Sequence, residues 1–178
     1  LGSIYYSDNN ISRDINKSIH YYSLSANQNY SEAQYNLGLI YSEGKYISRD
    51  MNKAIYYYSL AANQNHPKAQ FLLGLYYYFG YYIKKNINNG INWFLRSSEN
   101  NCIDAHFVLG FLFQEGKYVK RDMKKSIHHY KEASSFNSQY AKNNLGILYK
   151  HGIGVEANLE SAKIYFDEAI TQKDDPIS

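Results

Sequence analysis

Two stripes of apolar residues, each with helical spacing, follow one another along the chain. From Ala33 to Tyr41, apolar residues recur at intervals of three and four, which is the spacing of one helix face. A second stripe runs from Ala54 to Ala61. Between them, Gly44 follows the last apolar position of the first stripe, where a left-handed residue ends a helix. The pattern therefore predicts two helices joined by a loop.

The same pattern returns at a fixed interval. Glycines stand 36 residues apart at Gly38, Gly74, Gly110 and Gly146. Self-similarity at this period is typical of a repeat array, in which each unit contacts only its neighbours. We predict a single all-α solenoid domain of about five two-helix repeats. Its predicted repeats are about 1–32, 33–68, 69–104, 105–140 and 141–173, with a tail at 174–178.

Polar residues at the same interval predict how the helices begin and end. Good N-cap residues close the loops, at Asp14, Asp50, Asn86, Asp122 and Asn158. Asparagine is the usual substitute for glycine in a left-handed cap. The second helices are therefore predicted to end just before Asn29, Asn65, Asn101 and Asn137. Gly38 lies inside a predicted helix, where glycine costs about 1 kcal/mol relative to alanine. Its repetition predicts that two helices approach closely there.

These positions resemble the Sel-1-like repeat (SLR) family, which is related to tetratricopeptide repeats. The resemblance covers essentially the whole chain, and in the second repeat it rests on Ala33, Leu37-Gly38, Tyr41, Gly44, Asp50, Lys53-Ala54, Tyr57 and Ala61-Ala62. The loop's second glycine is present only as Gly154, and tyrosine stands there at Tyr46, Tyr82 and Tyr118. The resemblance implies a right-handed α/α superhelix whose concave face is lined by the first helices. It also implies an adaptor or scaffold with no catalytic activity and no cofactor.

Composition and charge narrow the partners and the compartment. The net charge of +3 is too weak to indicate a nucleic-acid partner. The longest uncharged apolar stretch, 71–83, is shorter than the ~20 residues that cross a bilayer, so we expect no membrane insertion. Cys102 is the single cysteine, which favours the cytoplasm, with the ER lumen as the alternative. Leu1 corresponds to the middle of a first helix, so we expect the chain to be a piece of a longer protein with neighbouring repeats or domains.

The chain lacks a recognisable catalytic or metal-binding motif. Its six histidines are scattered without an H-E-x-x-H arrangement. His128 and His129 are adjacent and point about 100° apart on a helix, so packing explains His129 better than metal binding. Cys102 and His106 have no dependable third member for a nucleophilic site. We therefore predict neither an enzyme nor a metal site.

One candidate binding surface is the outward side of the first helices. Its residues lie opposite the Leu37/Tyr41 stripe and recur every 36 residues. The candidate partner-binding residues are Leu39, Glu43, Leu75, Tyr78, Phe79, Phe111, Glu115, Ile147 and His151. An apolar patch with polar flanks suits a peptide or helix. For Tyr35, Phe71 and Phe107 we expect packing against the neighbouring repeat instead.

A second candidate surface is a basic edge formed by residues just before the N-caps, namely Arg13, Arg49, Lys85 and Arg121. Stacked repeats would place these charges along one edge, which suits either an acidic partner or a purely solvated surface.

We therefore predict a protein–protein scaffold that binds a protein or peptide through the concave face. The alternatives are a docking or regulatory segment of a larger signalling protein of the kinase type, a segment of a ubiquitin-ligase-associated protein, and a structural component of a large assembly.

Overall fold

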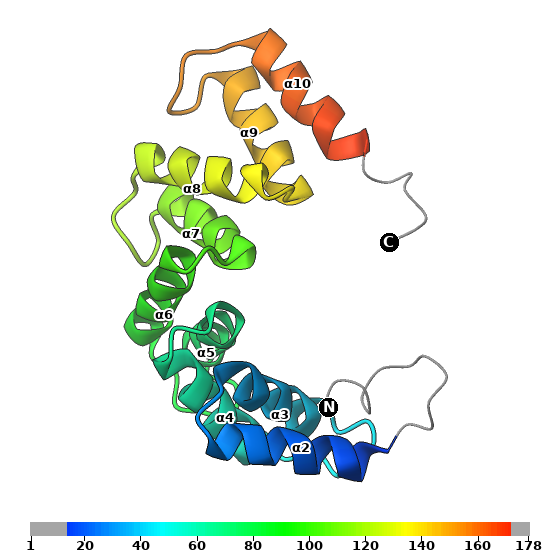
Figure 1. Cartoon of the computed structure of the whole chain (residues 1–178). Coiled ribbons are helices and arrows are strands. Elements are labelled where there is room, and N and C mark those ends of the chain that lie inside the picture. The colour runs from blue at the N-terminus through cyan, green and yellow to red at the C-terminus, as the bar shows by residue number, and fades with distance from the viewer. Residues whose placement is uncertain (1–13, 172–178) are drawn as a thin grey trace. The chain divides into compact units, whose positions relative to one another are not determined.

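The computed structural model describes residues 14–171, and these form α-helices joined by turns and loops, with no strand among them (Figure 1). The all-α fold expected from the repeats is confirmed. Arg13 and the tail at 174–178 lie outside the described residues. The helices of the described part are α2 (Ile15–Asn27), α3 (Ser31–Glu43), α4 (Met51–Asn63), α5 (Pro67–Phe79), α6 (Ile87–Glu99), α7 (Ile103–Glu115), α8 (Met123–Ser135), α9 (Gln139–His151) and α10 (Leu159–Ile170).

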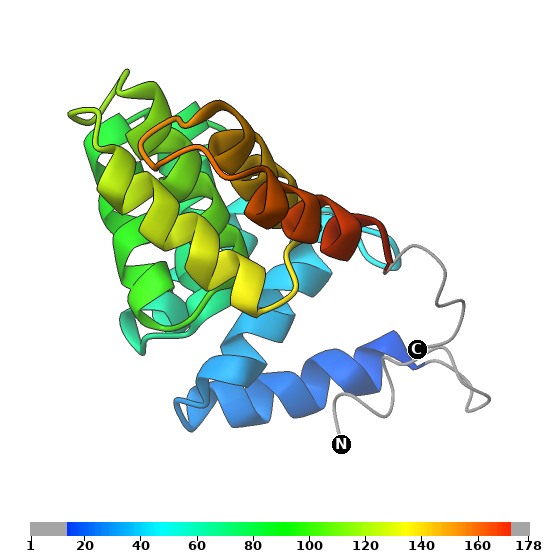
Figure 2. The same ribbon diagram turned by 90° about the horizontal axis from the view of Figure 1, so that it is seen from above.

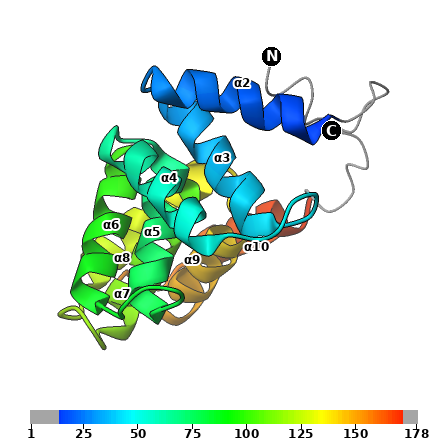
Figure 3. The same cartoon turned by 90° about the horizontal axis from the view of Figure 1, so that it is seen from below.

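The chain divides into two compact units, with unit 1 ending at Asn100 and unit 2 beginning at Asn101. In unit 1, α3 packs on α4 and α5 on α6 as helical hairpins, and α2 packs on α3 (Figures 1 and 3). In unit 2, α7 pairs with α8 and α9 with α10, and α8 packs on α9 (Figure 2). We refer to α3, α5, α7 and α9 as the first helices and to α4, α6, α8 and α10 as the second helices.

Side-chain caps begin each second helix, as the sequence predicts. In α4, the Asp50 carboxylate accepts a hydrogen bond of 3.0 Å from the backbone N–H of Lys53. In α10, the Asn158 amide oxygen accepts one of 2.8 Å from Ser161. Each bond satisfies an amide that has no partner within its helix. The same bond is made by Asp14, Asn86 and Asp122.

Left-handed residues end the helices at the predicted places. First helices end at glycines with φ between 62° and 80°, at Gly44, Gly80, Gly116 and Gly152. The turns after α2, α4, α6 and α8 contain left-handed asparagines with φ between 60° and 66°, at Asn29, Asn65, Asn101 and Asn137. Both predictions of the sequence are confirmed.

The glycines inside the first helices allow an aromatic ring to approach. A Cβ on Gly38 would lie 2.5 Å from the Tyr58 ring, and a Cβ on Gly110 would lie 2.6 Å from the Tyr130 ring. Separations below about 3 Å are not tolerated, so any larger residue would push the two helices of the hairpin apart. The close approach predicted from the repeated glycine is confirmed.

The buried tyrosines of the second helices keep their hydroxyls paired. The Tyr58 hydroxyl lies 2.9 Å from the Ser42 hydroxyl, and the Tyr130 hydroxyl donates to the Gln114 amide oxygen at 3.2 Å. Burial raises the pKa of both phenols, that of Tyr130 to about 12. Each ring also belongs to the core of its unit, beside small and branched residues such as Ala61. The hairpin contact therefore combines apolar burial with one satisfied polar group.

Candidate protein-binding surfaces

A buried polar residue stands at the same position, at intervals of 36 residues, in each first helix. We call these four residues the junction residues: Gln34, Gln70, His106 and Lys142. In unit 1, the Gln34 amide donates to the Ala26 carbonyl at 3.3 Å and to the Asn29 side chain at 3.2 Å. Its oxygen accepts a bond of 2.6 Å from Gln64. The amide thereby satisfies a helix-end carbonyl and holds the left-handed turn in place.

Gln70 repeats this arrangement one repeat later. Its amide donates to the Ala62 carbonyl at 3.1 Å and to the Asn65 side chain at 3.3 Å, and it accepts from Asn100 at 3.1 Å. The junctions of unit 1 are thus joined by neutral amides.

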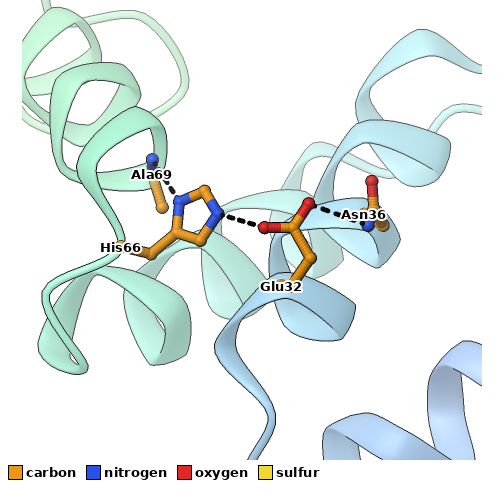
Figure 4. Close-up of polar contacts among 4 residues, drawn as sticks. All are labelled: Glu32, Asn36, His66 and Ala69. Carbon is orange, nitrogen blue, oxygen red and sulfur yellow. Dashed lines mark hydrogen bonds and ion pairs between the residues drawn. The ribbon is translucent and has the colours of Figure 1, made fainter. Parts of the chain in front are cut away.

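A histidine adds a further link between the start of α5 and α3 of the preceding hairpin (Figure 4). The Nδ1 atom of His66 accepts from the backbone N–H of Ala69 at 3.2 Å and caps α5. The proton of a neutral ring therefore sits on Nε2, which donates to the Glu32 carboxylate at 3.0 Å. Tyr35 stacks on the His66 ring, with centroids 4.5 Å apart. This histidine holds the repeats together.

Unit 2 places ionisable groups at the junction position. His106 and His129 lie with their Nδ1 atoms 3.0 Å apart, so one ring donates a proton that the other accepts. Burial lowers the pKa of His129 to about 4, and His106, His128 and Lys125 add to the lowering. Packing of His129, as predicted, is evident from its parallel contact with the Phe113 ring. Within residues 14–171, no group of three or more potential metal ligands gathers.

The second ionisable junction of unit 2 is built on Lys142. Its buried ammonium donates to the Asn137 side chain at 3.2 Å and pairs with the Glu168 carboxylate at 3.3 Å. Asn137 is the left-handed residue of the turn before α9, so the ammonium holds the same turn that an amide holds in unit 1.

The candidate binding residues of unit 1 differ in how far they face solvent. Leu39 packs against the core, and Leu75 is half-buried. Tyr78 is half-buried, with its ring 6.0 Å from that of Phe94 in α6. Phe79 is 50% exposed and stacks on Tyr81. Glu43 is also exposed. Phe79 is therefore the aromatic side chain of this set that is most available for contact.

In unit 2, the candidate residues are open to solvent. Phe111 is 48% exposed and Ile147 is 40% exposed. Glu115 and His151 are exposed at the ends of their helices. Phe107 instead contacts both Tyr130 and Tyr140.

Tyr35 contacts His66, the N-cap of α5, and Phe107 contacts Tyr140 of α9, so each packs against the following helical hairpin, as expected. Phe71 is half-buried and lies against Phe94 of its own repeat.

The basic edge is exposed at Arg49, Lys85 and Arg121. Arg49 differs from the other two because its guanidinium lies over the Tyr82 ring, 5.2 Å from the centroid. Nearby, the Lys53 ammonium lies 5.0 Å from the centroid of the Tyr41 ring. Aromatic faces attract cations in this way. Together these side chains border a hollow of about 470 Å³ beside the start of α4.

Several of these residues are missed by reasoning from the sequence. Gln34, Gln70 and His66 look like ordinary polar helix residues, and only their repetition beside the turn asparagines could have singled out the glutamines. Tyr82 has a detectable signal, because it stands where the fifth repeat has Gly154. Both residues adopt left-handed backbone, with φ of 61° and 74°. The pairing of Lys53 with Tyr41 follows from no local pattern.

Comparison with known families and structures gives a consistent result. A sequence model of the Sel1 repeat family matches residues 1–30, 31–66, 67–102, 103–135 and 139–174. Proteins with such repeats are generally non-catalytic interaction scaffolds. No curated protein matches the chain. None of the helices within 14–171 is long and apolar enough to cross a membrane.

Two similar solved structures share the fold over 98% of this chain, each with a TM-score of 0.88. One is a Sel1 repeat protein from Oxalobacter formigenes, 28% identical, of which this chain covers 71%. The other is c5321, a protective antigen of uropathogenic Escherichia coli strains with an SLR fold, 29% identical, of which this chain covers 37%. Cysteine-rich protein B of Helicobacter pylori shares the fold at 23% identity over 76% of this chain and 97% of its own, with a TM-score of 0.57.

Proposed function

Since the chain belongs to the Sel1 repeat family, we propose that it is a non-catalytic scaffold that binds a protein or peptide partner through the face formed by its first helices. The observation that carries the proposal is the exposure of large apolar side chains on these helices. Phe79 and Phe111 are each about half exposed, at 50% and 48%, and Ile147 is 40% exposed. Large exposed apolar groups framed by polar residues mark interaction sites.

Charged or ionisable residues stand at the C-terminal ends of first helices in both units. Glu43 ends α3, and Glu115 ends α7. His151 and Lys150 lie in the last turn of α9. An apolar centre with a charged rim is the usual anatomy of a protein interface. The partner we propose is a protein that offers apolar anchors to the exposed ring of each unit, to Phe79 in unit 1 and to Phe111 in unit 2.

The test is affinity capture from a lysate of the native source with wild-type and variant chains. We expect Phe79→Ser and Phe111→Ser to lower capture of the main partner by about tenfold, because hot-spot aromatics dominate interfaces. Matched controls lie on second helices: Tyr56→Ser in unit 1 and Ile164→Ser in unit 2 replace apolar side chains that are 59% and 52% exposed. Capture that falls equally in the controls, or in none of the variants, contradicts the proposal.

A second candidate role is a docking segment within a larger protein. The E. coli antigen favours it, since this chain covers 37% of that solved chain. In that role the same first-helix face would hold another domain of the parent protein, such as a kinase-type or ubiquitin-ligase-associated region. Sequencing the full gene distinguishes the two roles.

A further inference from the structure

The hollow beside the start of α4 is lined by two aromatic rings, each with a cation over its face. Arg49 lies over Tyr82, and Lys53 lies over Tyr41. The Arg49 Nε also donates to the sulfur of Met51 at 3.3 Å. No ion pair engages Arg49 within residues 14–171. Its guanidinium is thus oriented by a ring and a thioether, and its remaining donors are left for a ligand.

The charge of the lining is positive. Asp50 is its one carboxylate, and one oxygen of that carboxylate caps α4 through the Lys53 backbone N–H. The other oxygen lies 3.7 Å from the Lys53 ammonium in an exposed pair. Such a pair is weak in water. Arg49 and Lys53 therefore outweigh Asp50, and the hollow is complementary to a negatively charged group.

Tyr82 supplies a ring at a backbone position that disfavours any side chain. Its φ of 61° is left-handed, and its side chain is 57% exposed. In unit 2, Gly154 stands as far along the chain from Arg121 as Tyr82 stands from Arg49, and its φ is 74°. A glycine thus closes the same loop without strain, so the fold does not require the tyrosine. Strained residues of this kind gather where a side chain serves binding.

Unit 2 contains the other parts of this arrangement without the ring. Lys125 lies over Phe113, as Lys53 lies over Tyr41. Arg121 precedes the cap of α8, as Arg49 precedes that of α4. With Gly154 in place of Tyr82, Arg121 lacks the aromatic wall that orients Arg49. Arg121 in unit 2 therefore serves as a control for Arg49 in unit 1, because it has the same charge and the same place before a helix cap but no ring to orient it.

We propose that the hollow formed by Tyr41, Arg49, Lys53 and Tyr82 binds a carboxylate side chain of an acidic protein segment. The planar guanidinium of Arg49 meets the carboxylate, Lys53 adds a second charge, and the two rings contact the aliphatic part of the ligand. This inference rests on the proposed protein-binding function and names the chemistry of one contact. It assigns a role to one member of the basic edge and leaves Lys85 and Arg121 as solvated charges.

The experiment measures binding of a fluorescein-labelled polyglutamate peptide to the whole chain by anisotropy at low ionic strength. A polyglutamine peptide of equal length is the neutral control, and an oligothymidylate of equal length tests nucleic acid. We expect Arg49→Gln and Tyr82→Gly each to weaken polyglutamate binding by about tenfold. The matched variant Arg121→Gln removes the same charge in unit 2 and is expected to change affinity by less than about twofold.

Three results overturn the inference. Polyglutamate that does not bind the wild-type chain shows that the hollow is not an acidic-group site. Equal weakening by Arg49→Gln and Arg121→Gln shows diffuse charge attraction. Oligothymidylate that binds at least as tightly and depends on Arg49 assigns the hollow to nucleic acid.

Thermal melting of Tyr82→Gly separates binding from packing. We expect an unchanged or higher melting temperature, because glycine relieves the left-handed strain. A clear fall would show that the ring is a packing element and would also overturn the inference. Capture through Phe79 and Phe111 is measured separately, so failure here leaves the proposed function standing, and the reverse also holds.

Discussion

Unit 1 and unit 2 place different chemistry at the same position of the same scaffold. In unit 1 the junction residues are glutamines whose amides each make three hydrogen bonds. In unit 2 they are a histidine paired with another histidine and a lysine paired with Glu168. All four are buried. The helical hairpin is therefore shared, while the polar group at this position and its bonding partners vary.

This difference separates what the repeat requires from what it tolerates. Each hairpin requires a glycine beneath an aromatic ring and a cap at Asp or Asn. At Gln34, Gln70 and Lys142 the polar group bonds the left-handed asparagine that precedes its helix. His106 instead bonds His129 of its own hairpin. An amide bears no charge at any pH, whereas His129, the partner of His106, can take up a proton in acid.

The largest expected effect tests what the units share. Gly38→Leu and Gly110→Leu each force a side chain into a ring that a Cβ alone would approach within 2.5 and 2.6 Å. We expect each substitution to lower the free energy of unfolding by about 3 kcal/mol or more. Urea denaturation followed by circular dichroism measures it. A large loss in one unit and none in the other would show that the hairpin contact is not common to both.

The next largest effect comes from substitutions that each remove the hydrogen bonds of one junction residue. Gln70→Leu leaves the Ala62 carbonyl and the Asn65 side chain without their hydrogen-bond donor. We expect the free energy of unfolding to fall by about 2 kcal/mol. Lys142→Met keeps the apolar stem and returns the half-exposed Glu168 carboxylate to water. We therefore expect the free energy of unfolding to fall by about 1 kcal/mol. Both are compared by urea denaturation near neutral pH. A greater loss in Lys142→Met would reverse our ranking of the two kinds of junction.

A smaller effect concerns pH and is confined to unit 2. The pKa of His129 is about 4 in the folded chain, below the ordinary value of 6.5, so the unfolded chain takes up the proton first. The stability that the neutral His129 ring contributes is therefore fully present above pH 6.5, and it is lost as the pH drops from 6.5 towards 4. Because the ring is partly open to solvent, we expect a loss of about 1–2 kcal/mol.

Hydrogen exchange of individual amides measures this loss in each unit. His129→Gln is neutral at every pH and is expected to flatten the response of α7 and α8. The amides around Gln34 and Gln70, whose side chains are neutral at every pH, are expected to respond less than those of α7 and α8. No change in the response of α7 and α8 in His129→Gln would contradict this assignment.

The sequence predicts the hairpins well because their determinants are local. Asp50 caps a helix three residues on, Gly44 ends one, and Asn65 adopts the left-handed conformation that its short side chain tolerates. Gly38 is visible because it repeats. These features require no knowledge of distant contacts.

The junctions and the hollow are harder to predict because several of their contacts join residues 30 or more positions apart. Gln64 reaches Gln34 across 30 residues, and His66 reaches Glu32 across 34. A helical wheel places Tyr78 on the outward side of its helix, yet its ring also contacts that of Phe94, because a wheel does not show how far a long side chain reaches. The stacking of Arg49 on Tyr82 joins two loops that only the fold brings together.

Hydrogen exchange of the complex with the captured partner tests the central claim most directly. If the first helices form the binding face, partner binding slows exchange in α5 around Leu75–Phe79 and in α7 around Phe111, while α4 and α8 are unchanged. Protection confined to the second helices, or no protection on α5 and α7, would contradict the account.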